Sequence, residues 1–169
     1  PVSHLLCLTH AGTGLITKML SGPLLTHDLA RTAEVHPEMK PGDVLAGDRA
    51  FCSYVHVALL LQAGMHAVLR VGRRNIDFTP NRTFVFPATR RDQRSKGKAR
   101  SRLIKTLGEQ DQVVDWFKAR ERPPWISQEQ FDSLPGSIRV RELRYRVEQR
   151  GYRTREVTLV TTLLDSERY

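Results

Sequence analysis

The sequence has little cysteine, few aromatic residues and fewer acidic than basic side chains, and it contains no long apolar run. Its two cysteines, Cys7 and Cys52, are too few for a disulfide framework or a zinc knuckle. The longest purely apolar stretches, such as residues 58–61, are far shorter than the roughly 20 residues that a membrane-spanning helix needs. The sequence does not start with a charged segment followed by an apolar one, which is the pattern of a signal peptide. We therefore expect a cytoplasmic protein with reduced, half-buried thiols and no membrane partner.

The composition favours one globular domain that binds a negatively charged partner. The chain has 169 residues, of which 40% are hydrophobic, so it can bury a sizeable core. Lys and Arg number 27 against 18 Asp and Glu, which gives a net charge of +9. Such an excess indicates a polyanionic partner, and nucleic acid is the leading candidate. The first residue is Pro1 rather than Met, which is typical of a piece of a longer protein.

The basic charge is concentrated in the second half of the sequence. Residues 1–48 have three basic side chains against five acidic ones, whereas residues 70–105 have twelve basic side chains against two acidic ones. Seven arginines lie between Arg139 and Arg155, with only Glu142 and Glu148 to offset them. We therefore expect the polyanion to contact the part of the chain after residue 70.

The first 71 residues predict alternating strands and helices. Apolar runs at 4–10 and 15–20 flank a glycine-rich turn, which predicts a hairpin. Thr26 is a candidate N-cap for a helix through about Val35, ended by Pro37. A short strand at 43–48, a helix from the N-cap Ser53 to the C-terminal signal Gly64, and a strand at 65–71 follow. This βαβ unit predicts two parallel strands in one sheet.

The remaining residues have a less regular pattern. Phe78, Phe84 and Phe86 alternate with polar residues as in strands, and residues 89–100 form a highly charged run of low hydrophobicity. A short helix is predicted at 111–118, and Ser127 with Gln130 forms a weak capping box. Two strands are predicted at 138–147 and 154–163.

The sharpest candidate for chemistry is Asp48, which follows the buried strand of the βαβ unit. Ligands of open α/β sheets bind beyond the carboxyl ends of strands, so this carboxylate is well placed to hold a hard cation or to act as a base. The alternative is that Asp48 only caps the next helix, since Asp is a common N-cap.

Other candidates have a simpler structural explanation. The six histidines have no spacing typical of a zinc site. Cys52 is either a nucleophile or a small buried apolar residue. Gly12 and Gly14 are not followed by the helix of a phosphate loop, so a hairpin turn is the better interpretation. The seven basic residues between Arg90 and Arg102 form either a solvated loop or a phosphate contact, and their mutual repulsion favours the contact.

Several segments together resemble a known family. Residues 41–54, PGDVLAGDRAFCSY, closely resemble the segment around the second catalytic aspartate of bacterial DDE transposases of the insertion sequence four family. The collinear matches are LLLQAG at 59–64, HAV at 66–68, RPPW at 122–125, LP at 134–135, VRELR at 140–144 and LVTTLLD at 159–165. The resemblance extends over nearly the whole chain.

This resemblance implies an α/β fold: a partial ribonuclease H-like core with a mixed sheet, which has a basic, partly β insertion. It implies core residues at 1–71, an insertion at 72–153, and a return strand at 154–169 that stops before the helix with the catalytic Glu. In the family, two Asp and one Glu bind two Mg²⁺ or Mn²⁺ ions that activate a hydroxyl for attack on a DNA phosphodiester. Asp48 matches the second Asp, as catalytic residue and metal ligand, and Arg49 matches the Arg after it.

The resemblance also implies limits and partners. The first catalytic Asp and the Glu are not matched, so this chain has one catalytic acid of three and is expected to be inactive alone, although the parent enzyme cuts and joins transposon-end DNA. Ala50 replaces the more usual Gly. Expected partners are double-stranded DNA and, in the full-length enzyme, a second copy, in a nucleoid-associated bacterial protein. The expected DNA contacts are Arg49, Arg90, Arg91, Arg94, Lys96, Lys98, Arg100, Arg102, Arg141 and Arg144.

Two other functions stay open: a non-catalytic DNA-binding relic, and a phosphohydrolase of small substrates. The resemblance implies one structural expectation as well. The strand with the first Asp would lie between the strand at 4–10 and the strand that ends at Asp48. Without it, both neighbours would have an unpaired edge, and we expect an aggregation-prone or molten chain.

Overall fold

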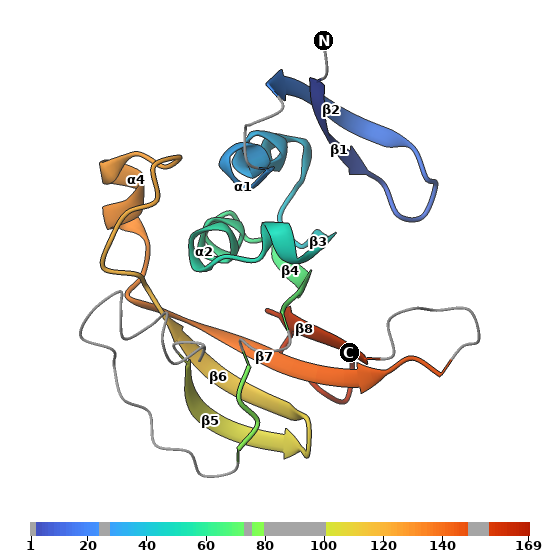
Figure 1. The fold of residues 1–169 in the computed structure, drawn as a ribbon, viewed down its shortest axis with the longest axis vertical. Helices are drawn as coiled ribbons and strands as arrows, with labels where there is room; N and C mark the ends of the chain where they lie inside the picture. Colours follow the sequence, from blue (N-terminus) through green and yellow to red (C-terminus); the bar gives the residue numbers. More distant parts are fainter. Residues whose placement is uncertain (1–2, 24–27, 73–75, 80–100, 149–155) are drawn as a thin grey trace.

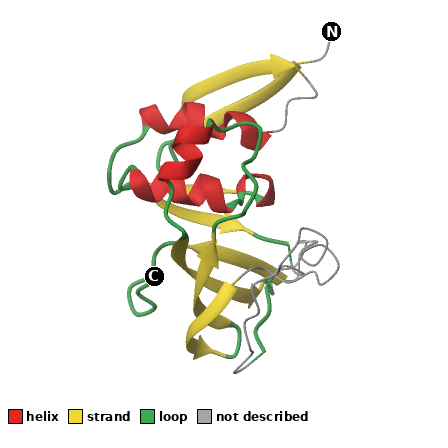
Figure 2. Ribbon diagram, turned by 90° about the vertical axis from the view of Figure 1, so that its left-hand side faces the viewer, coloured by secondary structure: helices red, strands yellow, loops and turns green. Residues whose placement is uncertain are grey.

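The computed structural model describes residues 3–23, 28–72, 76–79, 101–148 and 156–169. In Figure 1 these residues form a separate hairpin, a group of helices and a larger sheet. Figure 2 shows that the helices lie between the hairpin and most of the larger sheet. Among the described residues, no helix is long and apolar enough to cross a membrane.

The chain begins with the predicted hairpin. β1 (Ser3–Thr9) pairs antiparallel with β2 (Ile16–Pro23), and Leu6 lies opposite Leu20. Gly14 has a φ of 72°, a conformation that residues with a side chain rarely adopt, which explains a glycine in this turn. Gly12 and Gly14 therefore belong to a hairpin turn.

The predicted helix after the hairpin is shorter and tighter than expected. α1 spans only Asp28–Arg31, and a 3₁₀ helix, η1 (Thr32–Glu38), continues it and includes Pro37. The helical segment therefore ends at Glu38, three residues after the expected end at Val35, and Pro37 does not stop it. Arg31 donates from Nε to Oε1 of Glu34 at 2.8 Å across this turn. Thr26 lies outside the described residues.

The predicted βαβ unit is confirmed. β3 (Val44–Gly47) and β4 (His66–Arg70) are parallel, with Val44 opposite His66. Between them lie a short 3₁₀ helix, η2 (Arg49–Phe51), and α2 (Tyr54–Gln62). Ser53 caps α2, because its side-chain oxygen accepts a hydrogen bond from the His56 amide at 3.2 Å. Gly64 follows the helix with a φ of 73°, as expected of a C-terminal glycine.

A single mixed sheet joins this unit to the second half of the chain. Its strand order is β3-β4-β8-β7-β6-β5, and only the β3–β4 pair is parallel. The new strands are β5 (Ser101–Gly108), β6 (Asp111–Phe117), β7 (Ser137–Arg146) and β8 (Glu156–Thr161). The mixed sheet of the expected α/β fold is thus present, and strands of the expected insertion continue it.

Residues 111–118 form a strand rather than the predicted helix. β6 lies between β5 and β7, and residues 112–115 are all buried. Side chains on both faces of β6 are therefore covered, so the alternation that would identify a strand is missing. The adjacent β-branched residues Val113 and Val114 favour a strand.

The last helix and two strands agree with the sequence. α4 spans Gln128–Ser133, and the Ser127 hydroxyl accepts from the Gln130 amide at 3.1 Å. The strands predicted at 138–147 and 154–163 are β7 and β8. Phe78 lies in no strand, and Phe84 and Phe86 lie outside the described residues.

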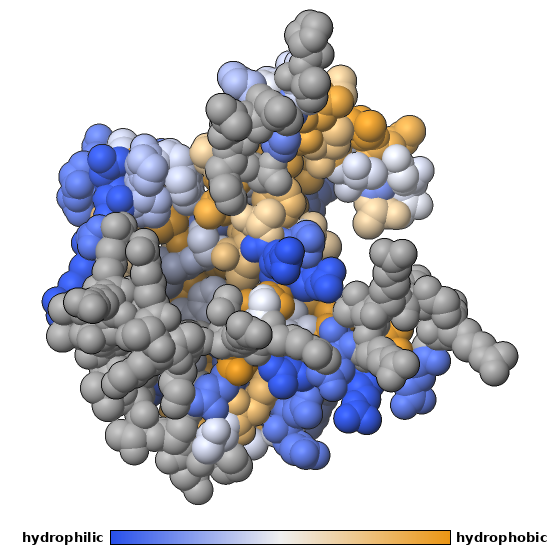
Figure 3. All heavy atoms as spheres, in the orientation of Figure 1, coloured by the Kyte–Doolittle hydropathy of each residue, from blue (hydrophilic) through white to orange (hydrophobic). Residues whose placement is uncertain are grey.

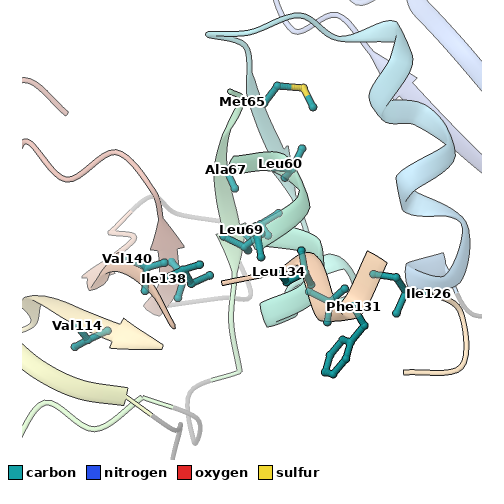
Figure 4. Packing of buried hydrophobic residues seen from close by; sticks show 14 of the residues in the cluster. Leu60, Met65, Ala67, Leu69, Val114, Ile126, Phe131, Leu134, Ile138 and Val140 are labelled. Carbon is teal, nitrogen blue, oxygen red and sulfur yellow. The ribbon is translucent and has the colours of Figure 1, made fainter. Parts of the chain in front are cut away.

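The core lies between the helices and the sheet. Leu60 of α2 and Leu69 of β4 are fully buried and pack in one cluster with Phe131 and Leu134, near α4, and Val140 of β7. Figure 4 shows these side chains converging from elements that are distant in the sequence. This core fixes the end of β3 relative to the rest of the sheet.

Candidate functional site at the carboxyl end of β3

Asp48 occupies the position expected of a ligand-binding residue. It directly follows β3 and is the N-cap residue of η2, but its side chain makes no capping hydrogen bond. Only its backbone carbonyl contributes to the turn, by accepting from the Phe51 amide at 3.0 Å. The side chain is 58% exposed. The carboxylate is therefore available for a ligand, which weakens the capping alternative.

The nearest charged neighbour of this carboxylate is Arg70. One Asp48 oxygen lies 3.6 Å from Arg70 Nη1, and the arginine is 45% exposed. The parallel register of β3 and β4 brings the two residues together, since Gly47 lies opposite Leu69. Exposed ion pairs of this length contribute little to stability. Arg49 is also exposed, so one carboxylate and two guanidinium groups share this end of the sheet.

A pair of histidines supports the turn after Asp48 from the inside. His56 Nδ1 lies 2.8 Å from the Phe51 carbonyl oxygen, and His56 Nε2 lies 3.0 Å from His36 Nε2. Because a carbonyl only accepts, His56 Nδ1 has the proton and His36 donates to His56. Burial and the neighbouring His56 lower the pKa of His36 to about 4, and burial lowers the pKa of His56.

Cys52 is not suited to act as a nucleophile here. Burial raises the pKa of its thiol to about 12, so the reactive thiolate is scarce near neutral pH. The structure favours the alternative of a small, half-buried apolar residue. Cys7, by contrast, is exposed on β1, although its apolar neighbours predicted a half-buried thiol. In a two-stranded hairpin, one face of β1 stays open.

The predicted DNA contacts have different environments. Arg102 is exposed, but it donates from Nη2 to Asp115 at 3.0 Å. Arg144 donates from Nε to Thr158 at 3.1 Å, and its guanidinium lies 5.1 Å from the ring centroid of Phe78. The six other predicted contacts after Arg49, namely Arg90, Arg91, Arg94, Lys96, Lys98 and Arg100, lie outside the described residues.

Arg141 has a structural role that the sequence did not predict. Its side chain is only 8% exposed and pairs with Asp111 through two N–H donors, at 2.8 and 2.5 Å. A third donor reaches the main-chain oxygen of Tyr169 at 2.7 Å. The interaction with Asp111 raises the pKa of Arg141, which stays charged. This guanidinium is occupied within the fold, and its assignment as a DNA contact stays a prediction.

Two further polar clusters on the sheet were missed. Asp115 accepts from both Arg102 and Arg139, and these hydrogen bonds lower its pKa, Arg139 more than Arg102. Glu142 is fully buried and accepts from Gln112 at 2.6 Å and from Trp116 at 2.8 Å. The sequence signal for these clusters is the alternation of charged with uncharged residues along β6 and β7. This alternation is recognisable only when residues 111–117 are taken as a strand.

The described residues do not form a complete metal site. Within the part of the chain that the structure describes, no three His, Cys, Asp or Glu residues come together as possible ligands. Asp48 therefore belongs to no such group among the described residues. Two Mg²⁺ ions need several carboxylate oxygens in addition to substrate phosphate, so these residues alone do not fit a two-ion centre.

The surface around this site is uneven. Figure 3 shows hydrophilic side chains over much of the larger sheet and a hydrophobic area on the hairpin. The exposed apolar residues of the hairpin include Leu5, Leu15, Ile16 and Met19.

Comparisons with protein-family models, with curated proteins and with solved structures found no match to this chain.

Proposed function

We propose that this chain is part of the catalytic domain of a DDE transposase and binds duplex DNA beside the carboxyl end of β3. The main support is the state of Asp48, whose exposed carboxylate neither caps η2 nor forms a tight ion pair. Its position after a strand of a parallel pair is one where α/β proteins bind ligands. The motifs that surround it resemble those of the transposase family.

The surrounding charge supports a phosphate-containing ligand. Arg49 and Arg70 flank the carboxylate, and the whole chain has a net charge of +9. Guanidinium groups bind phosphate oxygens through charge-assisted hydrogen bonds. The long Asp48–Arg70 distance leaves the arginine able to turn towards a phosphate.

In the complete enzyme, Asp48 would supply one ligand to Mg²⁺ or Mn²⁺, and the ions would assist attack on the phosphodiester. The described residues supply too few acids for two ions. This chain alone is therefore expected to bind DNA without cutting it. The same observation favours the second candidate, a DNA-binding relic without catalysis.

The first experiment measures affinity for a DNA duplex as a function of salt. The basic run at 90–102 is expected to neutralise about five phosphates, which gives a log-log salt slope near −4 to −5. Replacement of Arg94, Lys96, Lys98 and Arg100 by Gln should flatten this slope. An unchanged slope would assign the contacts to other residues.

The second experiment tests whether phosphate approaches Asp48. Asp48→Asn removes one negative charge beside the DNA, so affinity should rise about fivefold at low salt. Asp132→Asn is the matched control, because Asp132 is an exposed carboxylate on α4. An equal effect of both substitutions would remove the β3 end from the DNA interface. Mg²⁺-dependent nicking by the chain alone, abolished by Asp48→Asn, would contradict the claim that the chain is inactive.

A further inference from the structure

Two imidazole rings from separate helical segments meet through their Nε2 atoms. His36 lies on η1 and His56 lies on α2, and the two Nε2 atoms are 3.0 Å apart. The rings are nearly parallel, with 14° between their planes and 5.1 Å between their centroids. His56 is fully buried, whereas His36 is half-buried. Neither ring is proposed to contact DNA, so the chemistry of this pair is still unassigned.

The His56 ring is oriented in the way that metal-binding histidines are. Its Nδ1 donates to the Phe51 carbonyl oxygen at 2.8 Å, so its Nε2 is the atom with the available electron pair. In metal sites, a ligating imidazole almost always donates its other N–H to a carbonyl, a carboxylate or water, which fixes the tautomer and the direction of the ring. His56 Nε2 is therefore a metal-ligand atom held in place before any ion binds.

The second electron pair comes from His36. At a separation of 3.0 Å, the electron pairs of two nitrogens repel unless a positive group lies between them, and in the hydrogen-bonded pair the proton on His36 Nε2 has this role. A metal ion can replace this proton. Zinc–nitrogen bonds are about 2.0–2.1 Å long, so one ion beside the line that joins the two nitrogens reaches both. The displaced proton moves to His36 Nδ1, and the ring stays neutral.

A pocket beside His36 gives the pair an open side. Its volume is about 380 Å³, and its lining includes His36, Trp125 and the amide side chains of Gln62 and Gln130. The Gln62 amide donates from Nε2 to the Ser133 carbonyl at 3.0 Å, which leaves its side-chain oxygen as an acceptor. The pocket therefore offers polar groups and room for water molecules that complete the coordination of an ion.

We propose that His36 and His56 form a two-histidine site for a divalent transition-metal ion, which binds both Nε2 atoms and keeps water in its remaining positions. Imidazole suits Zn²⁺, Ni²⁺ and Cu²⁺, whereas Mg²⁺ prefers oxygen ligands. This ion would therefore differ from the ions expected at Asp48. It would link η1 to the turn after Asp48, because His56 also holds the Phe51 carbonyl. The inference depends on the fold alone and not on the proposed DNA chemistry.

The ligand set predicts an exchangeable ion rather than a permanent structural one. Structural zinc sites are closed by protein ligands alone. Within the described parts of the chain, no third His, Cys, Asp or Glu residue joins this pair. Water in the open positions makes the ion easier to remove by a chelator. Zn²⁺ should bind more tightly than Mn²⁺, as expected of nitrogen ligands.

The first test titrates the full chain with Zn²⁺ alone in a calorimeter. The parent should bind one ion saturably, and excess Mg²⁺ should not reduce this binding. His36→Gln and His56→Gln should each weaken it at least about tenfold. His66→Gln is the matched control and should bind as the parent does, because His66 is a half-buried histidine next to the Thr162 hydroxyl, at 3.2 Å. Equal Zn²⁺ affinity of the parent and His36→Gln would overturn the proposal.

Nitrogen NMR of the side chains gives a readout that does not depend on the folding of a variant. In the parent chain with labelled histidines, Zn²⁺ should shift the Nε2 resonances of His36 and His56. The His56 Nδ1 resonance should keep the position of a protonated nitrogen, because this atom still donates to Phe51. Shifts confined to other histidines would assign Zn²⁺ to another site and would overturn the proposal. A chain that binds Zn²⁺ at the pair but does not bind DNA would contradict the proposed function alone.

Discussion

Two acid–arginine pairs on the same sheet differ in their environment. At the end of β3, Asp48 and Arg70 are 3.6 Å apart and both are about half exposed. On β6 and β7, Asp111 and Arg141 are 2.5 Å apart at their closest, and the arginine is nearly fully buried. The Asp111–Arg141 pair links the neighbouring strands β6 and β7. The Asp48–Arg70 pair leaves both charges accessible to solvent. A binding site needs accessible charges, whereas an exposed pair adds little to the stability of the fold.

The largest expected effect is the loss of the buried pair. Arg141→Met removes three hydrogen bonds and leaves Asp111 without its partner. Breaking a buried pair in this way should lower the free energy of unfolding by about 3 kcal/mol in urea titrations. A loss below about 1 kcal/mol would show that the two pairs are equivalent.

Acid should destabilise the histidine pair, His36 and His56, that supports the turn after Asp48. His36 and His56 are neutral in the folded chain, and the folded pKa of His36 is about 4, below its ordinary value of 6.5. The unfolded chain therefore binds more protons between these values. The contribution of His36 should be complete above pH 6.5 and be lost as the pH falls towards 4, at up to about 1.4 kcal/mol per pH unit. The lowered pKa of His56 acts in the same direction.

The pH effect is checked by urea titrations across this range. His36→Gln should lower the slope, because the contribution of His36 is lost. The same slope in the parent and in His36→Gln would show that other groups cause the acid sensitivity.

A smaller effect is expected at the N-cap of α2. Ser53→Ala removes the acceptor for the His56 amide and should cost about 1 kcal/mol of unfolding free energy. Ser127→Ala removes the corresponding acceptor on α4 and is the matched control. If Ser53→Ala also shifts DNA affinity while Ser127→Ala does not, the cap positions the Asp48 turn.

The smallest effect on stability is expected at the exposed Asp48–Arg70 pair. Arg70→Met should change the free energy of unfolding by less than about 0.5 kcal/mol, since the pair is long and exposed. DNA affinity should nevertheless fall if Arg70 contacts phosphate. A loss of stability as large as that of Arg141→Met would mean that the β3 end serves the fold.

Sequence patterns predicted the elements that have local signals. The hairpin, the N-caps Ser53 and Ser127 and the parallel βαβ unit follow from turn residues, capping residues and apolar runs. The position of Asp48 after β3 followed from the same reasoning. These features depend on neighbouring residues, so a sequence contains the information directly.

The rest depends on contacts between distant segments. β6 was mistaken for a helix because side chains on both of its faces are buried, so its residues do not alternate between apolar and polar. Its partners β5 and β7 are set by the order of strands in the sheet. The same error hid the pairing of Arg141 with Asp111 and of Arg139 with Asp115. Arg70 was not recognised as the partner of Asp48, because only the register of β3 and β4 brings them together.

The place of β8 in the sheet affects how the chain can fold. β8 is the strand that connects β4 with β7, yet it is separated from β4 by most of the second half of the sequence. During synthesis, β4 therefore emerges long before its second partner exists. Non-local pairing of this kind slows folding and exposes strand edges to aggregation in the meantime. We expect that refolding is slow and that the formation of β8 pairs is the rate-limiting step.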